Sequence, residues 1–569
     1  MTTSSNAATT PLSSLEIAQQ AKLQPIEAIA EALGLEPEEV EPYGRYKAKI
    51  NLTAMDRLAS RPTGKLICVA GVTPTRAGEG KTTTAVSLTQ GLGVIGRSPV
   101  LCLREPSLGP VFGIKGGAAG GGWTQVVPME DLNLHFTGDI HAIGAANNLL
   151  AAMLDASILH GNEHKIDALR ITWRRAVDIN DRALREITIG QGGRPNGYPR
   201  ETGFDITAAS EVMAIVAVAR DLADLRARLG RITAAYSYDH ERPVTAEDLR
   251  AAGAMTVLLK DAIKPNLIQT LEGQPCLMHC GPFANIAHGN SSLIGTKLGL
   301  QLGDYVITES GFGSDMGMEK LFDIVCRSGG LRPSCVVLVC TVRALKHHGG
   351  LANGAADGPR SLAGIVIGSQ NLERHLGIVR EFGIPCVVAV NRRPEDTDEE
   401  VELVRKLALE YGAVAAEVND GFAHGGAGAA ELAQAVVDAA EGGGADFRLL
   451  YGDDDPLSSK IEAIATRVYG ASDVYFYPEA ETKLRQFTEL GLGRLPVCMA
   501  KTHLSLSADP TQLNAPSGFT LPVRDVRAYT GAGWLVPLCG DITQMPGLGK
   551  DPAATKVDIT EGGRTVGLF

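Results

Sequence analysis

The stretch Thr73-Pro74-Thr75-Arg76-Ala77-Gly78-Glu79-Gly80-Lys81-Thr82-Thr83-Thr84 directly follows the apolar run 66–70 and decides how the surrounding chain is expected to fold. Glycine lets a backbone come close to phosphate oxygens, and the free N–H groups at the start of a helix attract anions. We therefore interpret 75–82 as a loop for nucleotide phosphates. In this loop Gly78 and Gly80 shape the turn, Lys81 faces the outer phosphates, and Thr82 offers a hydroxyl to phosphate-bound Mg²⁺. Thr75 stands where the common pattern G-x-x-x-x-G-K-[ST] has its first glycine.

The neighbouring segments supply the context that such a loop requires. Residues 66–70 predict a strand, the pattern from Thr82 to Gly93 predicts a helix, and 99–103 predict a second strand. A strand, helix and strand in this order build a parallel sheet. Arg104 should therefore lie at the same carboxyl edge as the loop. The alternative, an ordinary glycine turn with a solvated Lys81, does not require this context.

Composition limits the classes of protein that need to be considered. The 569 residues suffice for two to four domains, and 44% hydrophobic with 21% charged residues is typical of a globular enzyme. A net charge of −12 disfavours a nucleic-acid surface. No apolar run approaches the ~18 residues of a membrane span, and the polar start lacks the features of a signal peptide, so we expect a cytoplasmic protein. The ten cysteines are expected to be reduced core thiols.

Two groups of side chains have spacings that could hold a metal. They are Cys276, His279, Cys280 and His288, and the group Asp131, His135, Asp139 and His141. The first group lacks the usual paired spacing, and Cys276 falls in an apolar strand; in the second, residues 136–138 interrupt the helix that would align the ligands. We favour buried thiols in the first group and a polar loop in the second.

Several predicted strands end in polar or glycine-rich segments. Strand 305–308 leads into Glu309 and 310–315, strand 335–341 into Arg343 and 346–350, and strand 386–390 into 391–394. Ligands bind beyond the carboxyl ends of strands in open α/β sheets, so these ends predict one composite site. The glycine passage 113–122, with Lys115 inside it and Trp123 after it, is expected to be a ligand loop rather than a linker.

The remaining segments predict helices and a separate tail. Residues 14–46 are expected to form two short helices, and 147–160 and 208–229 are expected to be helical. The turn-rich tail from Asn514 reads as part of a smaller folded unit. The residues alone support an α/β enzyme that uses a bound nucleotide, without deciding between ligation, phosphoryl transfer and a conformational switch.

Longer motifs make the resemblance specific. The run Arg104-Glu105-Pro106-Ser107-Leu108-Gly109-Pro110-Val111-Phe112-Gly113-Ile114-Lys115-Gly116-Gly117, continued to Gly122 and followed by Gln125-Val126-Val127-Pro128, resembles a signature of the formate–tetrahydrofolate ligases. The run Val339-Cys340-Thr341-Val342-Arg343-Ala344-Leu345-Lys346-His347-His348-Gly349-Gly350 resembles their second signature. Segments 199–206, 281–289 and 495–502 match as well, and the likeness runs from about Leu15 to Phe569.

The resemblance implies an activity and an architecture. The family joins formate to tetrahydrofolate with ATP, giving 10-formyltetrahydrofolate, ADP and phosphate through formyl phosphate, with Mg²⁺ on the ATP and K⁺ or NH₄⁺ as a monovalent activator. It implies a P-loop NTPase-like parallel sheet core with two smaller α/β domains, here 1–372, 373–458 and 459–569, in a cytoplasmic homotetramer. No nucleic acid or membrane is expected as a partner.

The resemblance also assigns residues. ATP is expected at Thr75, Arg76, Ala77, Gly78, Glu79, Gly80, Lys81 and Thr82, with Mg²⁺ at Thr82, and Lys81 and Arg104 are the expected catalytic residues, Arg104 holding formyl phosphate. Folate is expected at Phe312, Arg393, Pro394 and Phe422. The sequence departs from the family at Arg393 in Asn391-Arg392-Arg393-Pro394, where relatives often carry N-K-F-P, at Phe422 for tryptophan, at Trp123 for tyrosine and at Arg76 for proline. Because a guanidinium can stack on an aromatic ring, Arg393 is still expected to form part of the pterin shelf.

Two other classes share part of these features. A switch ATPase would begin with the same strand, glycine loop and lysine, and its ATP turnover would respond to a protein partner. A fused redox folate enzyme would need roughly 300 further residues and a second nucleotide fingerprint. Neither of these is present in the sequence.

Overall fold

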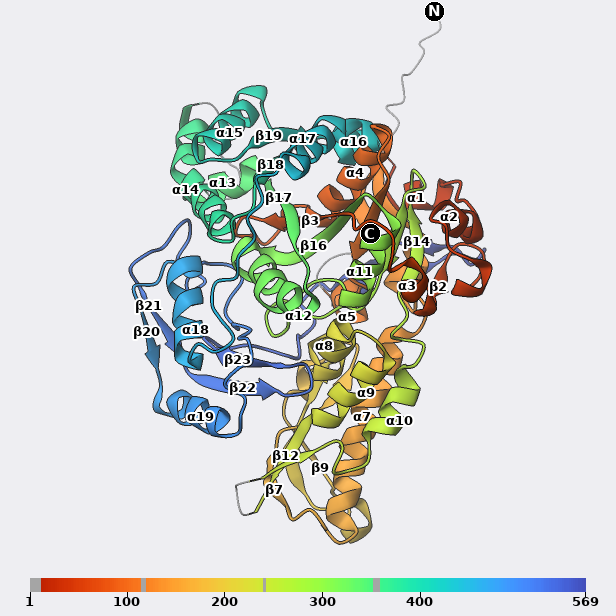
Figure 1. Cartoon of the computed structure of the whole chain (residues 1–569), viewed down its shortest axis with the longest axis vertical. Helices are drawn as coiled ribbons and strands as arrows, with labels where there is room; N and C mark the ends of the chain where they lie inside the picture. Colours follow the sequence, from red (N-terminus) through yellow and green to blue (C-terminus); the bar gives the residue numbers. More distant parts are fainter. Residues whose placement is uncertain (1–11, 114–118, 239–241, 352–358, 569) are drawn as a thin grey trace, which may run out of the picture.

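The computed structural model describes residues 12–113, 119–238, 242–351 and 359–568, arranged around one large twisted sheet (Figure 1). The sheet has twelve strands, and its main path runs β1-β2-β14-β15-β4-β16-β3-β17-β18-β19. These strands are β1 (Val40–Pro42), β2 (Ala48–Ile50), β14 (Asn266–Thr270), β15 (Pro275–Met278), β4 (Pro99–Leu103), β16 (Tyr305–Gly313), β3 (Lys65–Gly71), β17 (Pro333–Cys340), β18 (Cys386–Asn391) and β19 (Ala415–Asn419). Off this path, β5 (Gly120–Gly121) pairs with β6 (Thr124–Val127), which pairs with β14.

Seven neighbouring strands of the sheet, from β15 to β19, are parallel. The edge from β1 to β15 is antiparallel. Strand β16 lies between β3 and β4, so the loop after β3 and Arg104 after β4 share the carboxyl edge with one strand between them. This placement agrees with the prediction that the two belong to one edge.

Both faces of the parallel strands are covered by helices, and the alternation of side chains explains why. Ile67, Val69 and Val337 point into a core with α4 (Lys81–Val94) and α17 (Ala430–Glu441), whereas Leu66 and Cys68 point into the opposite core. Successive residues of a strand face opposite sides, so a strand covered on both sides is apolar throughout. The opposite face carries α11 (Leu293–Leu302), α13 (Val342–His348), α14 (Pro359–Glu381) and α15 (Asp398–Glu410).

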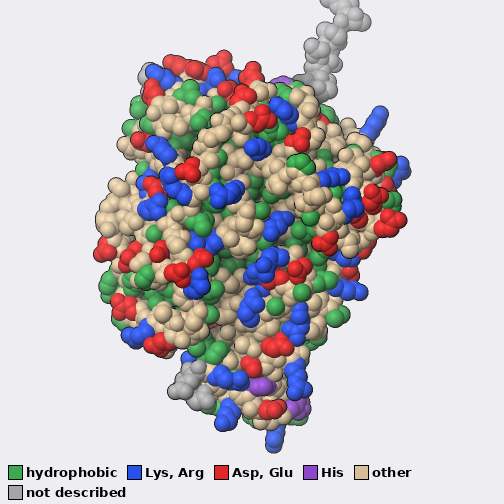
Figure 2. All heavy atoms as spheres, in the orientation of Figure 1, with side chains coloured by type: hydrophobic (Ala, Val, Ile, Leu, Met, Phe, Trp, Pro, Cys, Tyr) green, Lys and Arg blue, Asp and Glu red, His purple; other side chains and the backbone are tan. Residues whose placement is uncertain are grey.

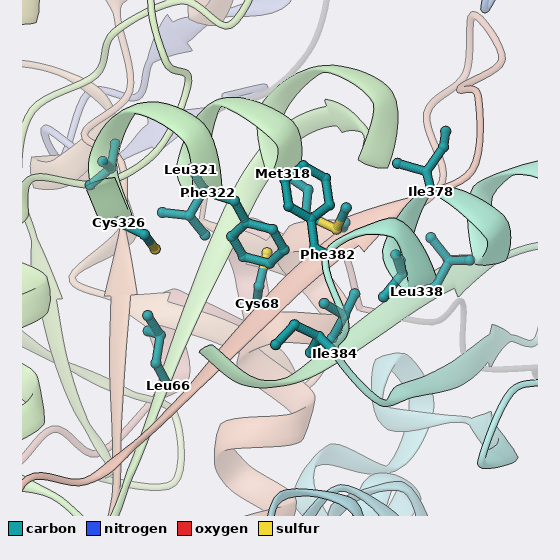
Figure 3. Close-up of a cluster of buried hydrophobic side chains, with 14 of the residues drawn as sticks. Leu66, Cys68, Met318, Leu321, Phe322, Cys326, Leu338, Ile378, Phe382 and Ile384 are labelled. Carbon is teal, nitrogen blue, oxygen red and sulfur yellow. The ribbon is translucent and has the colours of Figure 1, made fainter. Parts of the chain in front are cut away.

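The core on this second face is partly aromatic (Figure 3). Phe322 packs edge-on against Phe382 at 5.0 Å between ring centroids, and against Phe447 at 5.4 Å. Figure 3 shows Cys68 of β3 next to the Phe322 ring, with Leu66 of the same strand lower in the view. All ten cysteines are free and buried, as predicted for reduced core thiols. Burial raises the pKa of the Cys68 thiol to about 12.

An arm projects from the sheet between β6 and β14 (Figure 1). It contains α7 (Asp139–Leu159), α8 (Glu211–Val218), α9 (Leu222–Arg231) and α10 (Ala252–Leu259) around a core that also takes in Trp534 and Val536 of the C-terminal part. Its strands are β7 (Ile166–Ile171), β8 (Arg175–Val177), β9 (Ile187–Ile189), β10 (Arg200–Thr202), β11 (Phe204–Ile206), β12 (Thr233–Ser237) and β13 (Pro243–Thr245). Within the described residues α7 alone is long and apolar enough to cross a membrane by length and composition, and a third of that window is buried in the fold.

Two predictions for the arm need correction. The helix expected over 147–160 begins earlier, at Asp139, where the buried residues Asp139, Ile140 and Ile143 already follow helical spacing. The single helix expected over 208–229 is two helices. Ala219 is extended, and the Asp221 side chain accepts a hydrogen bond from the Asp224 N–H and so caps a new helix start.

The N-terminal helices are α1 (Ser14–Gln20), α2 (Ile26–Ala32) and α3 (Thr53–Leu58), the first two as predicted. Short helices α5 (Leu108–Gly113), α6 (Met129–Asn133), α12 (Arg327–Gly329) and α16 (Gly421–His424) connect longer elements. The C-terminal part holds α18 (Leu457–Ile464), α19 (Pro478–Glu489), β20 (Asp473–Phe476), β21 (Thr520–Val523), β22 (Asp525–Tyr529), β23 (Trp534–Leu538), β24 (Asp558–Ile559) and β25 (Thr565–Val566) in three two-stranded sheets. Position 372/373, where the family resemblance implied a boundary, falls inside α14, and β18 and β19 belong to the main sheet.

Figure 2 shows that basic and acidic side chains are interspersed over one face of the molecule.

The strands and helices together make the chain a mixed α/β protein with a large, mostly parallel sheet and several smaller sheets. The carboxyl edge of the parallel strands is where the predicted site residues converge.

Candidate active site

The phosphate loop leaves β3 and enters α4 through a glycine turn. Gly78 has φ 74° and Gly80 has φ 76°, a left-handed conformation that side chains other than glycine rarely adopt. A Cβ at Gly80 would also lie 2.9 Å from Asn391 Nδ2. Gly80 directly precedes Lys81, the first residue of the fourteen-residue α4, so the loop presents the positive end of a long helix dipole. Both glycines that the sequence singled out therefore have a structural reason.

Side chains from two neighbouring strand ends hold this loop in shape. The Glu79 carboxylate accepts hydrogen bonds from the Thr75 N–H at 2.8 Å and the Thr341 hydroxyl at 2.5 Å. Arg343 donates to the Gly78 carbonyl at 2.7 Å. Burial would raise the pKa of Glu79, but the hydrogen bonds from Thr341 and Thr75 and the charge of Arg343 outweigh it and lower that pKa. Glu79 is therefore an ionised brace of the loop.

Asn391, the last residue of β18, clamps the other side of the loop. Its Nδ2 donates to the Glu79 carbonyl at 2.8 Å and to the Gly80 carbonyl at 3.2 Å, and its Oδ1 accepts from the Thr84 hydroxyl at 2.9 Å. The sequence placed Asn391 at a strand end and gave it no role. Asn391 ends one strand and the loop follows another, far away in the sequence. No local sequence pattern could therefore have predicted their contact.

Thr82 and Glu309 form the oxygen-rich part of the site. The Thr82 hydroxyl donates to Glu309 Oε2 at 2.7 Å. Glu309 was predicted to follow a strand, but β16 continues to Gly313, so Glu309 and Phe312 lie within it. Pairing with β3 extends the strand, since Gly313 pairs with Gly71 after a shift in register between Glu309 and Gly313. A hydroxyl and a carboxylate side by side are oxygen ligands of the kind that Mg²⁺ prefers.

Lys81 and Arg104 place two cations near these oxygens. A Cβ built at Gly71 would lie 3.2 Å from Lys81 Cδ, so the Lys81 side chain runs over the end of β3. Arg104 donates from Nη1 to the Pro282 carbonyl at 3.3 Å and lies 3.5 Å from a Cβ built at Gly311. Burial lowers the pKa of Arg104, and the nearby charge of Glu309 raises it in part. Arg104 thus lies within electrostatic reach of the Thr82–Glu309 pair.

Phe312 carries an aromatic face at the same edge. Its φ of 61° is unusual for a residue other than glycine and turns the ring at the end of β16. The His503 ring stacks on it, 4.2 Å between centroids with a 19° angle between planes. His503 follows the segment that matched up to Thr502, and its contact with Phe312 was missed because nothing local links residues 191 positions apart.

The other predicted folate residues occupy separate neighbourhoods. Arg393 is half-buried beside Arg343, whose pKa is lowered by burial first and by Arg393 second. Pro394 is exposed. Phe422 on α16 is 56% exposed, and its carbonyl accepts a hydrogen bond from the Trp123 N–H at 2.9 Å, so two exposed aromatic residues lie together. Lys115 and residues 114–118 of the glycine passage lie outside the described residues.

The two suggested metal clusters are structural. His279 hydrogen-bonds Ser292 and the Ala262 carbonyl, both at 2.7 Å, while Asp139 pairs with Lys49 at 2.7 Å and Asp131 with Lys47 at 2.8 Å. Across the described ranges no group of three or more His, Cys, Asp or Glu side chains could hold a metal ion. The contacts of His279 agree with the interpretation of the first group as buried core. The polar loop expected for the second group is wrong at both ends, because Asp131 lies on α6 while Asp139 and His141 lie on α7, and only residues 134–138 connect the two helices.

Comparison with known proteins gives one consistent result. The family model described as formate–tetrahydrofolate ligase matches residues 12–569. Formate–tetrahydrofolate ligases of similar sequence include that of Desulforamulus reducens, 58% identical over 98% of this chain and 99% of the relative. That of Granulibacter bethesdensis is 55% identical over 98% and 97%, and that of Roseiflexus castenholzii 55% identical over 98% and 100%.

Proposed function

Because this chain belongs to the formate–tetrahydrofolate ligase family and ligates formate to tetrahydrofolate in one-carbon metabolism, we propose that it does so through formyl phosphate formed at the carboxyl edge of the main sheet. The observation that supports this most directly is the convergence of the phosphate loop, the Thr82–Glu309 pair and Arg104 on the ends of β3, β16 and β4.

The chemistry explains why ATP is needed. A formate oxygen attacks the γ-phosphorus of ATP, the bond to the β-phosphate oxygen breaks, and ADP leaves with that electron pair. The resulting formyl phosphate has a good leaving group on its carbonyl carbon. The N10 amine of tetrahydrofolate attacks that carbon, phosphate departs with the C–O electron pair, and the amine loses its proton.

The loop residues bind and orient ATP in this proposal. Residues 75–80 offer backbone N–H groups, and Lys81 gives a point charge for the outer phosphates. The Thr82 hydroxyl and the Glu309 carboxylate fit the Mg²⁺ that accompanies ATP, since both are oxygen donors 2.7 Å apart beside the loop. When bound, that ion neutralises charge on the transferring phosphoryl group. Glu79 and Asn391 keep the loop rigid.

Arg104 holds the formyl phosphate. A guanidinium donates two parallel hydrogen bonds to carboxylate or phosphate oxygens, which fixes their orientation and offsets the charge that develops during transfer. Its site is half-buried beside Glu309, so each hydrogen bond is stronger than it would be in water.

Folate completes the site through Phe312, Arg393, Pro394 and Phe422. Phe312 offers a ring at the end of β16, Phe422 is largely exposed, and Arg393 supplies a planar cation suited to stacking. These assignments rest on matched positions and, for Phe422, on the exposure of its ring.

The finer architecture is proposed on the same resemblance. It comprises a P-loop NTPase-like core that continues beyond residue 372 to include β18 and β19, a smaller unit in 459–569, a cytoplasmic homotetramer, and activation by K⁺ or NH₄⁺. No cluster of acidic or histidine side chains in the described residues marks the cation's position. Light scattering during gel filtration tests the tetramer.

One assay tests the function. ADP release is measured with MgATP alone, with formate, with tetrahydrofolate, and with both. We expect sustained release only with both, together with the absorbance of the product after acidification. ADP release indifferent to both small molecules would contradict the proposal.

A further inference from the structure

A buried histidine joins the phosphate loop to the strand end that carries Phe312. His375 lies on α14 and is fully buried. Its Nε2 hydrogen-bonds the Thr73 hydroxyl at 2.9 Å, and its Nδ1 hydrogen-bonds the Ser314 hydroxyl at 2.7 Å. Thr73 opens the phosphate loop, and Ser314 comes two residues after Phe312. One imidazole ring therefore spans the two segments that bind different substrates in the proposed function.

Thr73 is held at all of its polar atoms. Asn371, one turn before His375, accepts from the Thr73 N–H at 3.2 Å and donates to its hydroxyl at 3.0 Å. His348 Nε2 hydrogen-bonds the Thr73 carbonyl at 2.9 Å. Because every partner is a side chain of α13 or α14, the start of the loop follows the position of these helices.

The far side of the ring is equally constrained. Gly313 pairs with Gly71, and a Cβ at Gly313 would lie 3.1 Å from His375 Cε1 and 2.4 Å from Asp315 Oδ1. The ends of β3 and β16 thus meet through two glycines with the histidine ring against them. A close-packed contact of this kind transmits a displacement instead of absorbing it.

From Ser314 the network continues to the other side of Phe312. Asp315 forms a fully buried ion pair with Lys501 at 2.9 Å. Lys501 begins the segment that holds His503, which stacks on Phe312. The path from Thr73 to the Phe312 ring therefore combines the two hydrogen bonds of His375, the Asp315–Lys501 ion pair, the short backbone links 314–315 and 501–503, and the stacking of His503 on Phe312.

His375 is neutral in this position. Burial lowers its pKa to about 4, although Asp315 opposes this shift. A neutral imidazole has one donor and one acceptor nitrogen, which matches two hydroxyl partners that can each give or take a hydrogen bond. The ring therefore acts as a fixed spacer at physiological pH.

We propose that His375 is a positioning residue that couples occupancy of the phosphate loop to the geometry of the folate ring site. Transfer requires the formyl carbon and the folate amine to meet at bonding distance, so a small error in the spacing of the two segments lowers the rate strongly. The proposal rests on the function proposed above and adds a residue that touches neither substrate.

Two substitutions separate the two halves of the bridge. In His375→Asn the shorter side chain keeps a polar atom near the position of Nδ1 and loses the bond to Thr73. In His375→Gln the longer side chain reaches the position of Nε2 and loses the bond to Ser314. Ser369→Ala is the matched control, because Ser369 is also buried on α14 but bonds Tyr411 and the Val366 carbonyl.

The deciding measurement is the affinity for MgADP by calorimetry, with and without saturating tetrahydrofolate and in the absence of formate. Coupling appears as the ratio of the two dissociation constants. In the native protein we expect the two dissociation constants to differ by at least about fivefold. In both His375 variants they should differ by less than about twofold. In Ser369→Ala the ratio should equal that of the native protein. We also expect kcat to fall at least tenfold in the His375 variants.

A second pair of variants covers the case in which His375 variants fold poorly. Thr73→Val and Ser314→Ala each remove one hydroxyl, and Thr73→Ser should restore the native ratio. If His375 couples the sites, the effects of Thr73→Val and Ser314→Ala on the ratio are not additive, since either one breaks the bridge.

Several outcomes overturn the inference. The ring would be only structural if the native protein gave a ratio of one for the two MgADP dissociation constants. The same holds if the His375 variants kept the native ratio, or if the effects of Thr73→Val and Ser314→Ala on it were additive. If instead the native protein fails to bind MgADP or tetrahydrofolate at all, the proposed function itself fails.

Discussion

A guanidinium can hold two oxygens at once, whereas an ammonium is a single point charge, and this difference makes Arg104→Lys an informative substitution. We expect kcat to fall about 10²–10³-fold, the range seen when one stabilising donor is lost from a transition state. The KM for MgATP should stay within threefold, because the phosphate loop is untouched.

Steady-state ligase assays check this, with Arg97→Lys as the control. Arg97 follows α4 at the opposite edge of the sheet and lies over the Tyr305 ring at 6.0 Å. Its replacement should leave kcat unchanged. If the kcat of Arg104→Lys stayed within twofold of the native value, Arg104 would have no role in the reaction.

Arg393 tests the most divergent part of the folate site. Stacking of a guanidinium on an aromatic ring contributes ~0.5–2 kcal/mol, so Arg393→Ala should raise the KM for tetrahydrofolate roughly 2- to 30-fold with a smaller change in kcat. The neighbouring Arg392 is exposed and pairs with Asp398 at 2.6 Å. Arg392→Ala is therefore a matched control that should leave both constants unchanged, and an unaltered KM in Arg393→Ala would refute the stacking assignment.

At the scale of elements, helix α8 begins with a carboxyl group that titrates in an unusual range. Burial raises the pKa of Glu211 to about 7, although hydrogen bonds from the Ala532 and Gly531 N–H groups lower it in part. The folded state therefore binds this proton more tightly than the unfolded state. Stability from this group is present at low pH and is lost as the pH rises from about 4.5 to about 7.

Glu211→Gln keeps an acceptor for both N–H groups and removes the titration. When the pH rises from 4.5 to 8, the free energy of unfolding of the variant should increase by about 3 kcal/mol relative to that of the native protein, since one pKa unit corresponds to about 1.4 kcal/mol. Urea unfolding at both pH values measures this. A native-minus-variant difference that is the same at both values would disprove the assignment.

The elements around the loop could be predicted because local chemistry dictates them. Gly78 and Gly80 need left-handed backbone, β4 is apolar throughout and β3 is apolar after Lys65, and α4 begins directly after the loop. The continuation of β16 past Glu309 could not be predicted, because Ser310 and Gly311 carry no strand pattern and only pairing with β3 extends it. The break between α8 and α9 was missed because the apolar periodicity continues across Ala219.

The side-chain partners of the site were the least predictable. Arg104 and Glu309 could be placed at one edge from strand order alone. The clamp by Asn391, the stacking of His503 on Phe312 and the bridge through His375 join residues that are far apart in sequence. Nothing in a local pattern specifies such contacts.

At the scale of the whole molecule, one buried ion pair joins the sheet to the arm. Lys49 of β2 and Asp139 of α7 are 2.7 Å apart, and Asn266 of β14 donates to the same carboxylate at 2.8 Å. Lys49→Met leaves a buried carboxylate without its cation, and we expect a loss of about 3–5 kcal/mol in free energy of unfolding.

Adding Asp139→Asn to Lys49→Met should recover part of this loss, because the uncompensated charge disappears. Lys406→Met is the control, since Lys406 and Glu410 form an exposed pair at 3.8 Å that contributes at most about 0.5 kcal/mol. Thermal and urea unfolding measure the stability of the single variant, the double variant and the control. A double variant less stable than Lys49→Met would contradict the explanation.

The position of β3 in the middle of the sheet has a consequence for synthesis of the chain. This strand ends at Gly71, but its two neighbours, β16 and β17, begin at Tyr305 and Pro333. At roughly 5–20 residues per second, a ribosome needs about 12–50 s to make the 234 residues from Gly71 to Tyr305. Throughout that interval an apolar strand and its nucleotide loop have no pairing partner, so nascent chains should depend on chaperones and gain ATP binding only after more than half of the protein has been translated.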